Sequence, residues 1–157
     1  MSITLECCDA SQWSGNADLI FTGPYAPLPE CLRGKPAIIS NFAHRKELCE
    51  RHIGGELHEV GSWSSGLRSR IWVSNLPIIK IDLEDLIEEE FVPGRGWFPL
   101  DLPLRLLSVY GRKGMTIWDG FMGRGTVGKA CQMLDMNFIG LDIDPDRVQI
   151  AREYLNI

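Results

Sequence analysis

A glycine-rich turn between a strand and a helix constrains the fold of this chain more than any other feature. The segment WDGFMGRGTVGKAC ends a predicted strand at Asp119 and passes through Gly120, Gly123 and Gly125 into a predicted helix. Glycine permits a tight turn and lets backbone N–H groups approach a ligand closely. A further strand, NFIGLDI, follows the helix and carries Asp142 near its end. Two strands joined by a crossover helix form a βαβ unit, which builds a parallel sheet.

The two acidic strand ends indicate a nucleoside-binding site. A carboxylate at the position of Asp142 can accept hydrogen bonds from both hydroxyls of a ribose. Alternatively, Gly123 and Gly125 only allow the helix to pack closely on the strand. That alternative leaves Asp119 and Asp142 at neighbouring strand ends without a purpose. The turn is not followed by a phosphate-binding Gly-Lys-Ser/Thr, which disfavours kinases and NTPases.

The rest of the chain alternates strand-like and helical patterns, which is typical of an α/β fold. Short apolar runs predict strands at ITLEC, DLIFT and AIISNF. Two further runs, ELHEVGSW and RIWVSNLPIIKI, stand close together and predict an antiparallel hairpin at one edge of the sheet. The Gly/Ser/Arg-rich segment 61–70 is predicted to be a mobile, contact-making loop. The predicted fold is a mostly parallel sheet with this hairpin at one edge and helices on both faces.

A single domain spanning 1–157 is expected, because this length suffices for one sizeable core. The acidic, Pro/Gly-rich segment 82–99 is the best candidate for a linker, and it divides the domain into halves 1–81 and 100–157. Helices are predicted after this linker at LPLRLLSVYG and at DPDRVQIAREYLNI. In the second helix Asp144 is a natural N-cap and Pro145 takes the favoured first helical position.

Composition and charge restrict the classes of function. No apolar run approaches the roughly 20 residues that span a bilayer, and the amino terminus lacks a signal-peptide pattern, so we expect a cytoplasmic protein without a membrane partner. The 5 cysteines form no C-x-x-C pair. We therefore expect reduced thiols, mostly in the core, and no metal. The net charge of −5 gives no global basic field, so any DNA binding must rest on local patches.

At the glycine turn the sequence resembles the DNA amino-methyltransferases that use S-adenosylmethionine. Their signature reads D-P-F-x-G-x-G-T-T, then a helix, then F-I-G-I-E-I-D-P. The F-x-G-x-G core and the following threonine are present at 121–126, and Gly120 replaces the usual proline. The resemblance implies a Rossmann-like methyltransferase fold and S-adenosylmethionine as cofactor. The implied cofactor-binding residues are Asp9, Asp119, Phe121, Gly123, Gly125, Thr126 and Asp142.

The amino-terminal half resembles the catalytic half of the same family, in the permuted β-type motif order. ITLECCDA is similar to the strand and acidic turn that precede the catalytic strand, which would bring Asp9 near the adenine of the cofactor. DLIFTGPY falls where the family has D-L-I-x-T-[D/N/S]-P-P-Y, with Thr22 at the acceptor position and Gly23 at the first proline. In the family, the acceptor aims the target amino group at the methyl and the tyrosine stacks on the flipped base. The implied catalytic residues are Thr22, Gly23, Pro24 and Tyr25.

The resemblance also implies that DNA is the partner. Local arginines are the candidates for contacts, namely Arg45, Arg68 and Arg70. No separate target-recognition domain is expected between the two halves. Target recognition is therefore expected from the loop 61–70, from the segment near Arg45, or from a partner subunit or a second copy in a homodimer.

The leading hypothesis is transfer of a methyl group from S-adenosylmethionine to the exocyclic amino group of a DNA base, adenine in preference to cytosine. A second hypothesis is a degenerate member of the family that acts as a non-catalytic binding or partner subunit. It is motivated by Thr22 and Gly23, which depart from the family motif. A third, methylation of a protein or small molecule, is suggested by the acidic net charge.

Overall fold

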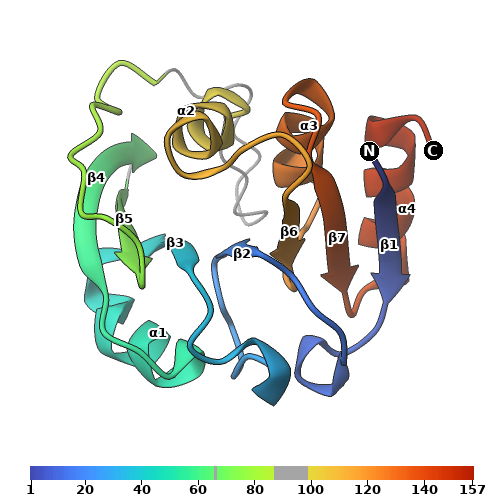
Figure 1. Cartoon of the computed structure of the whole chain (residues 1–157), viewed down its shortest axis with the longest axis horizontal. Helices are drawn as coiled ribbons and strands as arrows, with labels where there is room; N and C mark the ends of the chain where they lie inside the picture. The colour runs from blue at the N-terminus through green and yellow to red at the C-terminus, as the bar shows by residue number, and fades with distance from the viewer. Residues whose placement is uncertain (66, 87–98) are drawn as a thin grey trace.

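The computed structural model describes residues 1–65, 67–86 and 99–157. In these segments, seven strands form one sheet in the order β1-β7-β6-β2-β3-β5-β4 (Figure 1). The strands are β1 (Ile3–Cys7), β2 (Leu19–Thr22), β3 (Ala37–Phe42), β4 (His58–Ser65), β5 (Leu67–Ser74), β6 (Thr116–Asp119) and β7 (Asn137–Asp142). The helices are α1 (Lys46–Ile53), α2 (Asp101–Tyr110), α3 (Thr126–Met133) and α4 (Pro145–Leu155), with short 3-10 turns η1 (Ala10–Gln12), η2 (Glu30–Leu32) and η3 (Ala43–Arg45). None of the described helices is both long and apolar enough to cross a lipid bilayer.

The sheet is mostly parallel, as the sequence predicts. β1, β7, β6, β2 and β3 pair in parallel, whereas β5 pairs antiparallel with both β3 and β4. The chain leaves β6 toward β7 on one side and leaves β2 toward β3 on the other, so a topological switch point lies between β6 and β2. Ligands of open α/β sheets bind at such a point, beyond the carboxyl ends of the strands.

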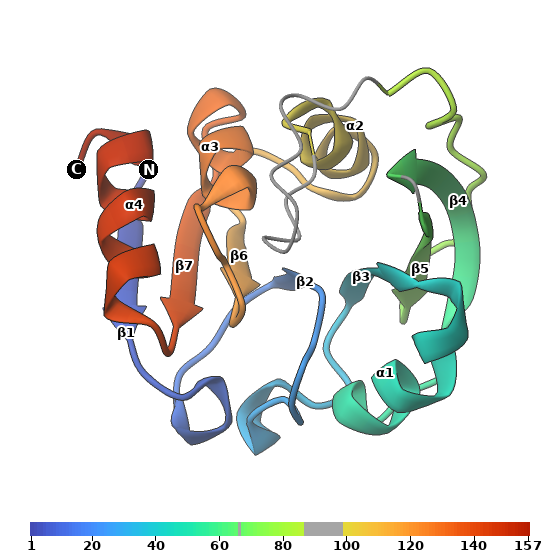
Figure 2. The same ribbon diagram turned by 180° about the vertical axis from the view of Figure 1, so that it is seen from behind.

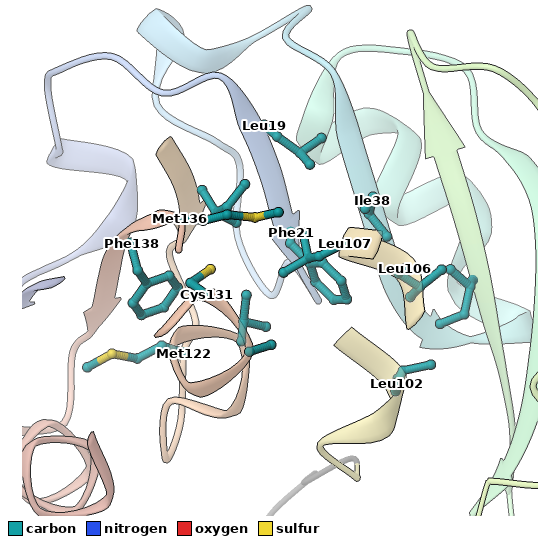
Figure 3. Packing of buried hydrophobic residues seen from close by; sticks show 14 of the residues in the cluster. Leu19, Phe21, Ile38, Leu102, Leu106, Leu107, Met122, Cys131, Met136 and Phe138 are labelled. Carbon is teal, nitrogen blue, oxygen red and sulfur yellow. The ribbon is translucent and has the colours of Figure 1, made fainter. Parts of the chain in front are cut away.

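Two hydrophobic layers enclose the sheet. Helices α2, α3 and α4 cover one face, and α1 with η1 and η2 covers the other (Figures 1 and 2). Side chains of β2 alternate between the layers, so that Leu19 and Phe21 lie in the first and Ile20 in the second. Figure 3 shows Leu19 and Phe21 in one cluster with Leu106 and Leu107 of α2. The first layer therefore holds β2 in place, and the carboxyl end of β2 lies at the switch point, where it can form part of a site.

Strong local signals locate several elements closely. The strands observed at β1 and β3 have the predicted bounds, and α4 follows Asp144 as predicted. The Asp144 side chain accepts a hydrogen bond from the Asp146 N–H at 2.9 Å, and Pro145 occupies the first helical turn. Helix α3 ends at Met133, earlier than the sequence pattern suggests.

The predicted loop at 61–70 is wrong, because most of this segment is paired strand. β4 continues to Ser65 and β5 begins at Leu67, and the ladder pairs Trp63 with Ser69. Trp63 is buried whereas the preceding Ser62 is half-buried, as in a strand with one covered face. Ser69, the partner of Trp63 in the ladder, is buried as well, so this segment is a hairpin with one face in the core. The second strand also ends at Ser74, short of the predicted 81, and Asn75 follows with a left-handed φ of 54°.

The expectation that the cysteines are mostly core is wrong as well. All five are free thiols, as predicted, but only Cys49 and Cys131 are buried. Cys7 ends β1, which is an edge strand with one covered face, so its side chain is exposed. In the predicted linker 82–99, residues 82–86 form a turn that buries Leu83. The rest, 87–98, lies outside the described residues, so the division into two halves stays a prediction.

Candidate functional site

A pocket of about 330 Å³ lies at the carboxyl ends of β1, β7, β6 and β2. It gathers residues that are far apart in the chain, and four of them, Asp9, Tyr25, Phe121 and Asp142, are predicted site residues. The complete lining is Cys8, Asp9, Ala10, Tyr25, Ala26, Gly120, Phe121, Asp142, Ile143 and Arg147. Its volume is in the range of small-molecule sites, about 300–1,000 Å³.

Asp142 is buried at the end of β7 and is tied to the glycine turn. Its Oδ2 accepts a hydrogen bond from the Gly123 N–H at 3.2 Å, and its Oδ1 accepts one from the Asp144 N–H at 3.0 Å. The Arg147 guanidinium lies 3.9 Å from the same Oδ2. A carboxylate has about four lone-pair sites. Asp142 thus holds the turn in place and keeps lone pairs for ligand hydroxyls.

The glycine turn has a conformation that larger residues would strain. Gly123 and Gly125 have φ of 55° and 86°, in the left-handed region. At Gly120, a Cβ would overlap the Trp118 ring and lie 2.9 Å from the Ala10 Cβ. The family's proline is therefore absent here because the Trp118 indole fills its place.

A fourth glycine of this segment was missed by the sequence analysis. Gly128 lies on α3, and a Cβ at this position would lie 2.7 Å from the Phe138 ring of β7. It therefore allows close packing of the helix on the strand. The G-x-G-x-x-G spacing of Gly123, Gly125 and Gly128 is the signal that could have identified it.

Asp9 stands at the start of η1, beside the pocket. Its Oδ1 accepts hydrogen bonds from the Ser11 N–H at 2.9 Å and the Ser11 hydroxyl at 2.8 Å. These two bonds hold the pKa of the Asp9 carboxyl below its ordinary value. Asp9 is therefore an ionised acceptor at neutral pH. The predicted residue Thr126 is buried at the first position of α3 and does not line the pocket.

Across the switch point, Thr22 at the end of β2 and Asp119 at the end of β6 form a buried pair. The Thr22 hydroxyl donates to Asp119 Oδ1 at 2.6 Å, and the Phe121 N–H donates to the same oxygen at 3.0 Å. Burial raises the pKa of the Asp119 carboxyl to about 7 and outweighs the lowering by these two hydrogen bonds. The Asp142 carboxylate raises this pKa further. Sequence reasoning assigned Asp119 to the cofactor alone and missed this pair, because pairing across β2 and β6 depends on the sheet order.

Gly23 lies where the chain leaves β2 and passes close to β3. A Cβ at this position would lie 2.6 Å from the Ser40 carbonyl oxygen. This oxygen belongs to the backbone, which cannot move aside as a flexible side chain could. The proline of the family motif is therefore excluded by the approach of β3. Gly23 and Pro24 do not line the pocket, whereas Tyr25 does.

Tyr25 presents its ring at the mouth of the pocket, with 63% of the residue surface exposed. The edge of the Phe121 ring meets it at a centroid distance of 5.9 Å. The Arg45 guanidinium carbon lies 5.7 Å from the centroid of the Tyr25 ring. The structure thus brings Arg45, a predicted DNA contact, to the predicted catalytic tyrosine.

The other predicted DNA contacts lie in the hairpin. Arg70 pairs with Glu59 of the neighbouring strand at 3.1 Å, so its charge is partly neutralised. The side chain of Arg68 lies outside the described residues. Beside Arg45, Phe42 and His44 stack at a centroid distance of 6.0 Å with nearly parallel planes, which no sequence pattern indicated. Among the residues that the structure describes, no group of His, Cys, Asp and Glu could hold a metal ion.

These features define a class of protein: an α/β sheet with a pocket of small-molecule size, a glycine turn and a buried carboxylate at the carboxyl ends of its strands. Sequence comparisons narrow the class. A family model described as DNA methylase matches residues 92–153. The type II methyltransferase M.Cfr9I of Citrobacter freundii is 26% identical over 140 residues, 88% of this chain and 43% of that protein. The type II methyltransferase M.BglI of Bacillus subtilis is 41% identical over 56 residues, 36% of this chain and 16% of that protein.

Solved structures show the same fold. The M1.HpyAVI–SAM complex superimposes with a TM-score of 0.71 at 20% identity and covers 99% of this chain and 100% of that one. The cytosine-N4-specific PvuII DNA methyltransferase has a TM-score of 0.64 at 12% identity and covers 96% of this chain and 85% of that one. The chain is therefore similar to DNA methyltransferases in sequence and shares their fold. It spans less than half the length of the curated relatives named above.

Proposed function

We propose that this protein transfers the methyl group of S-adenosylmethionine to the exocyclic amino group of a DNA base. The observation that carries the proposal is the pocket that joins Asp9 and Asp142 to Tyr25. In this proposal Asp9 and Asp142 form the nucleoside site, and the Tyr25 ring on the other side of the switch point stacks on the base. The similarity of the sequence to DNA methyltransferases supports the same reaction.

The residues present fit S-adenosylmethionine. Asp142 would accept hydrogen bonds from the ribose hydroxyls, and the ionised Asp9 would accept one from the adenine amino group. Phe121 offers an apolar surface in the pocket, and the turn at Gly123 and Gly125 leaves room for a close backbone approach. When bound, the cofactor supplies an electrophilic methyl on a sulfonium, whose departure leaves a neutral thioether. The protein therefore needs no strong acid, and orientation supplies most of the rate.

The base side of the site holds the target nucleotide. Tyr25 would stack on the flipped base, which extends an aromatic platform already formed with Phe121. Thr22 would accept a hydrogen bond from the target amino group, because its own hydrogen points to Asp119 and leaves its lone pairs available. Gly23 and Pro24 would set the path of the backbone between these two side chains. The nitrogen lone pair then faces the methyl in a near-attack geometry.

The target base is proposed to be adenine. Thr22 alone does not distinguish the amino group of adenine from that of cytosine, and a similar fold occurs in a cytosine-N4-specific enzyme. Incubation with methyl-labelled S-adenosylmethionine and DNA of mixed sequence, followed by mass spectrometry of the nucleosides, identifies the product. N6-methyladenine is expected, and N4-methylcytosine would reassign the base without changing the reaction class.

Two variants connect the product to the site. Tyr25→Phe retains the stacking ring and should retain transfer, whereas Tyr25→Ala should lower it, since base–aromatic stacking is worth about 1–3 kcal/mol per base. Thr22→Ala should reduce transfer to background while the affinity for S-adenosylmethionine stays unchanged. Background incorporation by the parent protein itself would contradict the proposed function.

A second candidate function is a non-catalytic binding subunit of the same fold. The observation that favours it is the burial of Thr22, which is only 3% exposed and already bonded to Asp119. In that case the parent protein binds S-adenosylmethionine but transfers no methyl group. A partner subunit or a second copy would then complete the enzyme. Sedimentation of the protein alone and with DNA measures whether two copies of the chain associate.

A further inference from the structure

The Thr22–Asp119 pair is isolated from solvent at the point where β2 and β6 lie side by side. Thr22 is 3% and Asp119 4% exposed, and their oxygens are 2.6 Å apart. The hydroxyl of Thr22 donates to Oδ1, and the backbone N–H of Phe121 holds that same oxygen in place. The titratable groups that act on Asp119 from other elements are Asp142 on β7 and Cys131 on α3. The pair is therefore fixed in geometry, with a hydroxyl that links the carboxylate to the end of β2.

Methylation of an amino group releases a proton, which must pass to an acceptor. When the nitrogen lone pair bonds to the methyl carbon, the carbon–sulfur bond breaks and its electrons stay on sulfur. The nitrogen then carries a positive charge until one of its protons departs. An acceptor within hydrogen-bond reach, or one connected through a hydroxyl, is the general solution to this problem.

We propose that Asp119 is a positioning residue of the transfer site, which holds the Thr22 hydroxyl as an acceptor for the target amino group and receives its proton through that hydroxyl. The inference rests on the proposed function. One amino proton moves to Thr22 Oγ1 as the hydroxyl proton moves to Asp119 Oδ1. The balance closes with one new N–C bond, a neutral methylated amine, a neutral thioether and a protonated Asp119. Release of that proton to solvent after product departure restores the pair.

The electrostatics of the pair suit this role. Burial raises the pKa of Asp119 to about 7, so the carboxyl can both accept and release a proton near neutral pH. The hydrogen bond from Thr22 opposes this rise, so loss of the hydroxyl should raise the pKa of Asp119 further. If Thr22 served only as a hydrogen-bond donor to the buried Asp119 carboxylate, the geometry would be the same. The rate of methyl transfer would then not depend on the ionisation of Asp119.

The first test compares Asp119→Asn with the parent. The amide oxygen can still accept from Thr22 and Phe121, but it takes no proton. The transfer rate should fall by about 10²–10⁴-fold, the usual contribution of general acid–base catalysis. The parent rate should rise with pH through about 7 as Asp119 ionises, and this limb should be absent from the variant. Cofactor affinity, measured by calorimetry, should remain within a few-fold of the parent.

The second test uses the hydroxyl. Thr22→Val removes it at nearly constant volume, and Thr22→Ser restores it in a smaller side chain. The valine variant should lose transfer, and the serine variant should rescue both the rate and the pH limb. In the free protein without cofactor, the carboxyl carbon resonance of Asp119 should titrate near pH 7, and its midpoint should move upward in Thr22→Val but not in Thr22→Ser.

The outcomes separate the two proposals. A parent protein that transfers no methyl group overturns the proposed function, and the relay with it. An active parent whose Asp119→Asn variant keeps the same rate and the same pH limb overturns the relay alone. An unchanged Asp119 midpoint in Thr22→Val also overturns the relay, since it would mean that the two groups are not coupled in solution.

Discussion

The proposed cofactor side and the proposed base side of the site depart from the family motifs in different ways. On the cofactor side, the turn at Gly123 and Gly125 matches, and Asp142 holds it by a hydrogen bond. On the base side, Thr22 and Gly23 both differ from the family pattern. Each departure has a partner elsewhere in the fold, since Thr22 bonds to Asp119 and Gly23 lies against the Ser40 carbonyl.

A residue at a motif position must therefore fit the neighbouring atoms in this particular fold. Gly120 supports this on the cofactor side, where the Trp118 ring fills the space of the usual proline. Restoring a family residue at one position alone should therefore fail. A proline at 23 in particular would direct its Cβ into the β3 backbone.

The largest effect is expected from Asp119→Asn, which removes the buried carboxyl group that bonds to Thr22, and it concerns the free energy of unfolding. The folded pKa of Asp119, about 7, lies above its ordinary value of 3.8, so folding is favoured most by the protonated form. This contribution is fully present below pH 3.8 and is lost as pH rises through about 7. Relative to the parent, Asp119→Asn should gain up to about 4 kcal/mol of unfolding free energy between pH 4 and pH 8, at 1.36 kcal/mol per pKa unit.

Urea unfolding at several pH values measures this difference. Asp135→Asn is the matched control, because its carboxylate is exposed and pairs with Lys113 at 3.0 Å on the surface. The control should show no pH-dependent gain near 7. A pH-independent difference between Asp119→Asn and the parent would contradict the raised pKa.

On the cofactor side, Asp142→Ala should weaken S-adenosylmethionine binding by about 1.5–3 kcal/mol, the scale of hydrogen bonds to a charged group. Titration calorimetry measures the affinity. Asp144→Ala is the control, because Asp144 caps α4 two residues away but does not line the pocket. It should lower stability by about 1 kcal/mol and leave the affinity unchanged. Equal affinities for parent and Asp142→Ala would remove the ribose assignment.

Back on the base side, Gly23→Ala should lower the unfolding free energy by about 1–3 kcal/mol, the usual result of overpacking. The new Cβ would lie 2.6 Å from a backbone oxygen of β3. Gly55→Ala is the control, since a Cβ there would lie 2.9 Å from the Ser74 hydroxyl, which can rotate away, and at an ordinary contact distance of 4.0 Å from the Ile53 side chain. Thermal unfolding of both variants measures the two losses of stability. Similar losses would mean that the β3 backbone moves to make room for the new Cβ at position 23.

The sequence predicts the cofactor side of the fold well because its signals are local. The apolar run of β7, the N-cap of α4 and the glycine turn each depend on neighbouring residues, and each element is found where expected. The confirmed sheet type also follows from such local patterns, since strands and helices alternate along the chain.

The base side depends on contacts that no local pattern encodes. Thr22 and Asp119 are 97 positions apart, and their hydrogen bond exists only because β2 pairs with β6. The antiparallel hairpin is found as predicted, but the loop predicted within it at 61–70 is wrong for a related reason. Serines and arginines suggested a loop, whereas the buried Trp63 and Ser69 pair across the two strands.

The smallest expected effect is on the salt dependence of DNA binding, and it tests whether DNA lies beside Tyr25. Arg45 lies 5.7 Å from the centroid of the Tyr25 ring, at the mouth of the pocket, whereas Arg70 pairs with Glu59. A phosphate that follows a base stacked on Tyr25 would meet the Arg45 guanidinium first. Arg45→Ala should therefore reduce the slope of log affinity against log salt by about one unit.

Filter binding of one DNA duplex over a range of salt concentrations measures this slope. Arg112→Ala is the matched control. Arg112 is exposed just before β6, at the amino end of that strand, whereas the pocket lies at the carboxyl ends of the strands. It removes the same charge but should leave the slope unchanged. Arg70→Ala should fall between the two, since its guanidinium already has a carboxylate partner. An equal decrease in the Arg45 and Arg112 variants would show that net charge, rather than the position beside Tyr25, governs the contact with DNA.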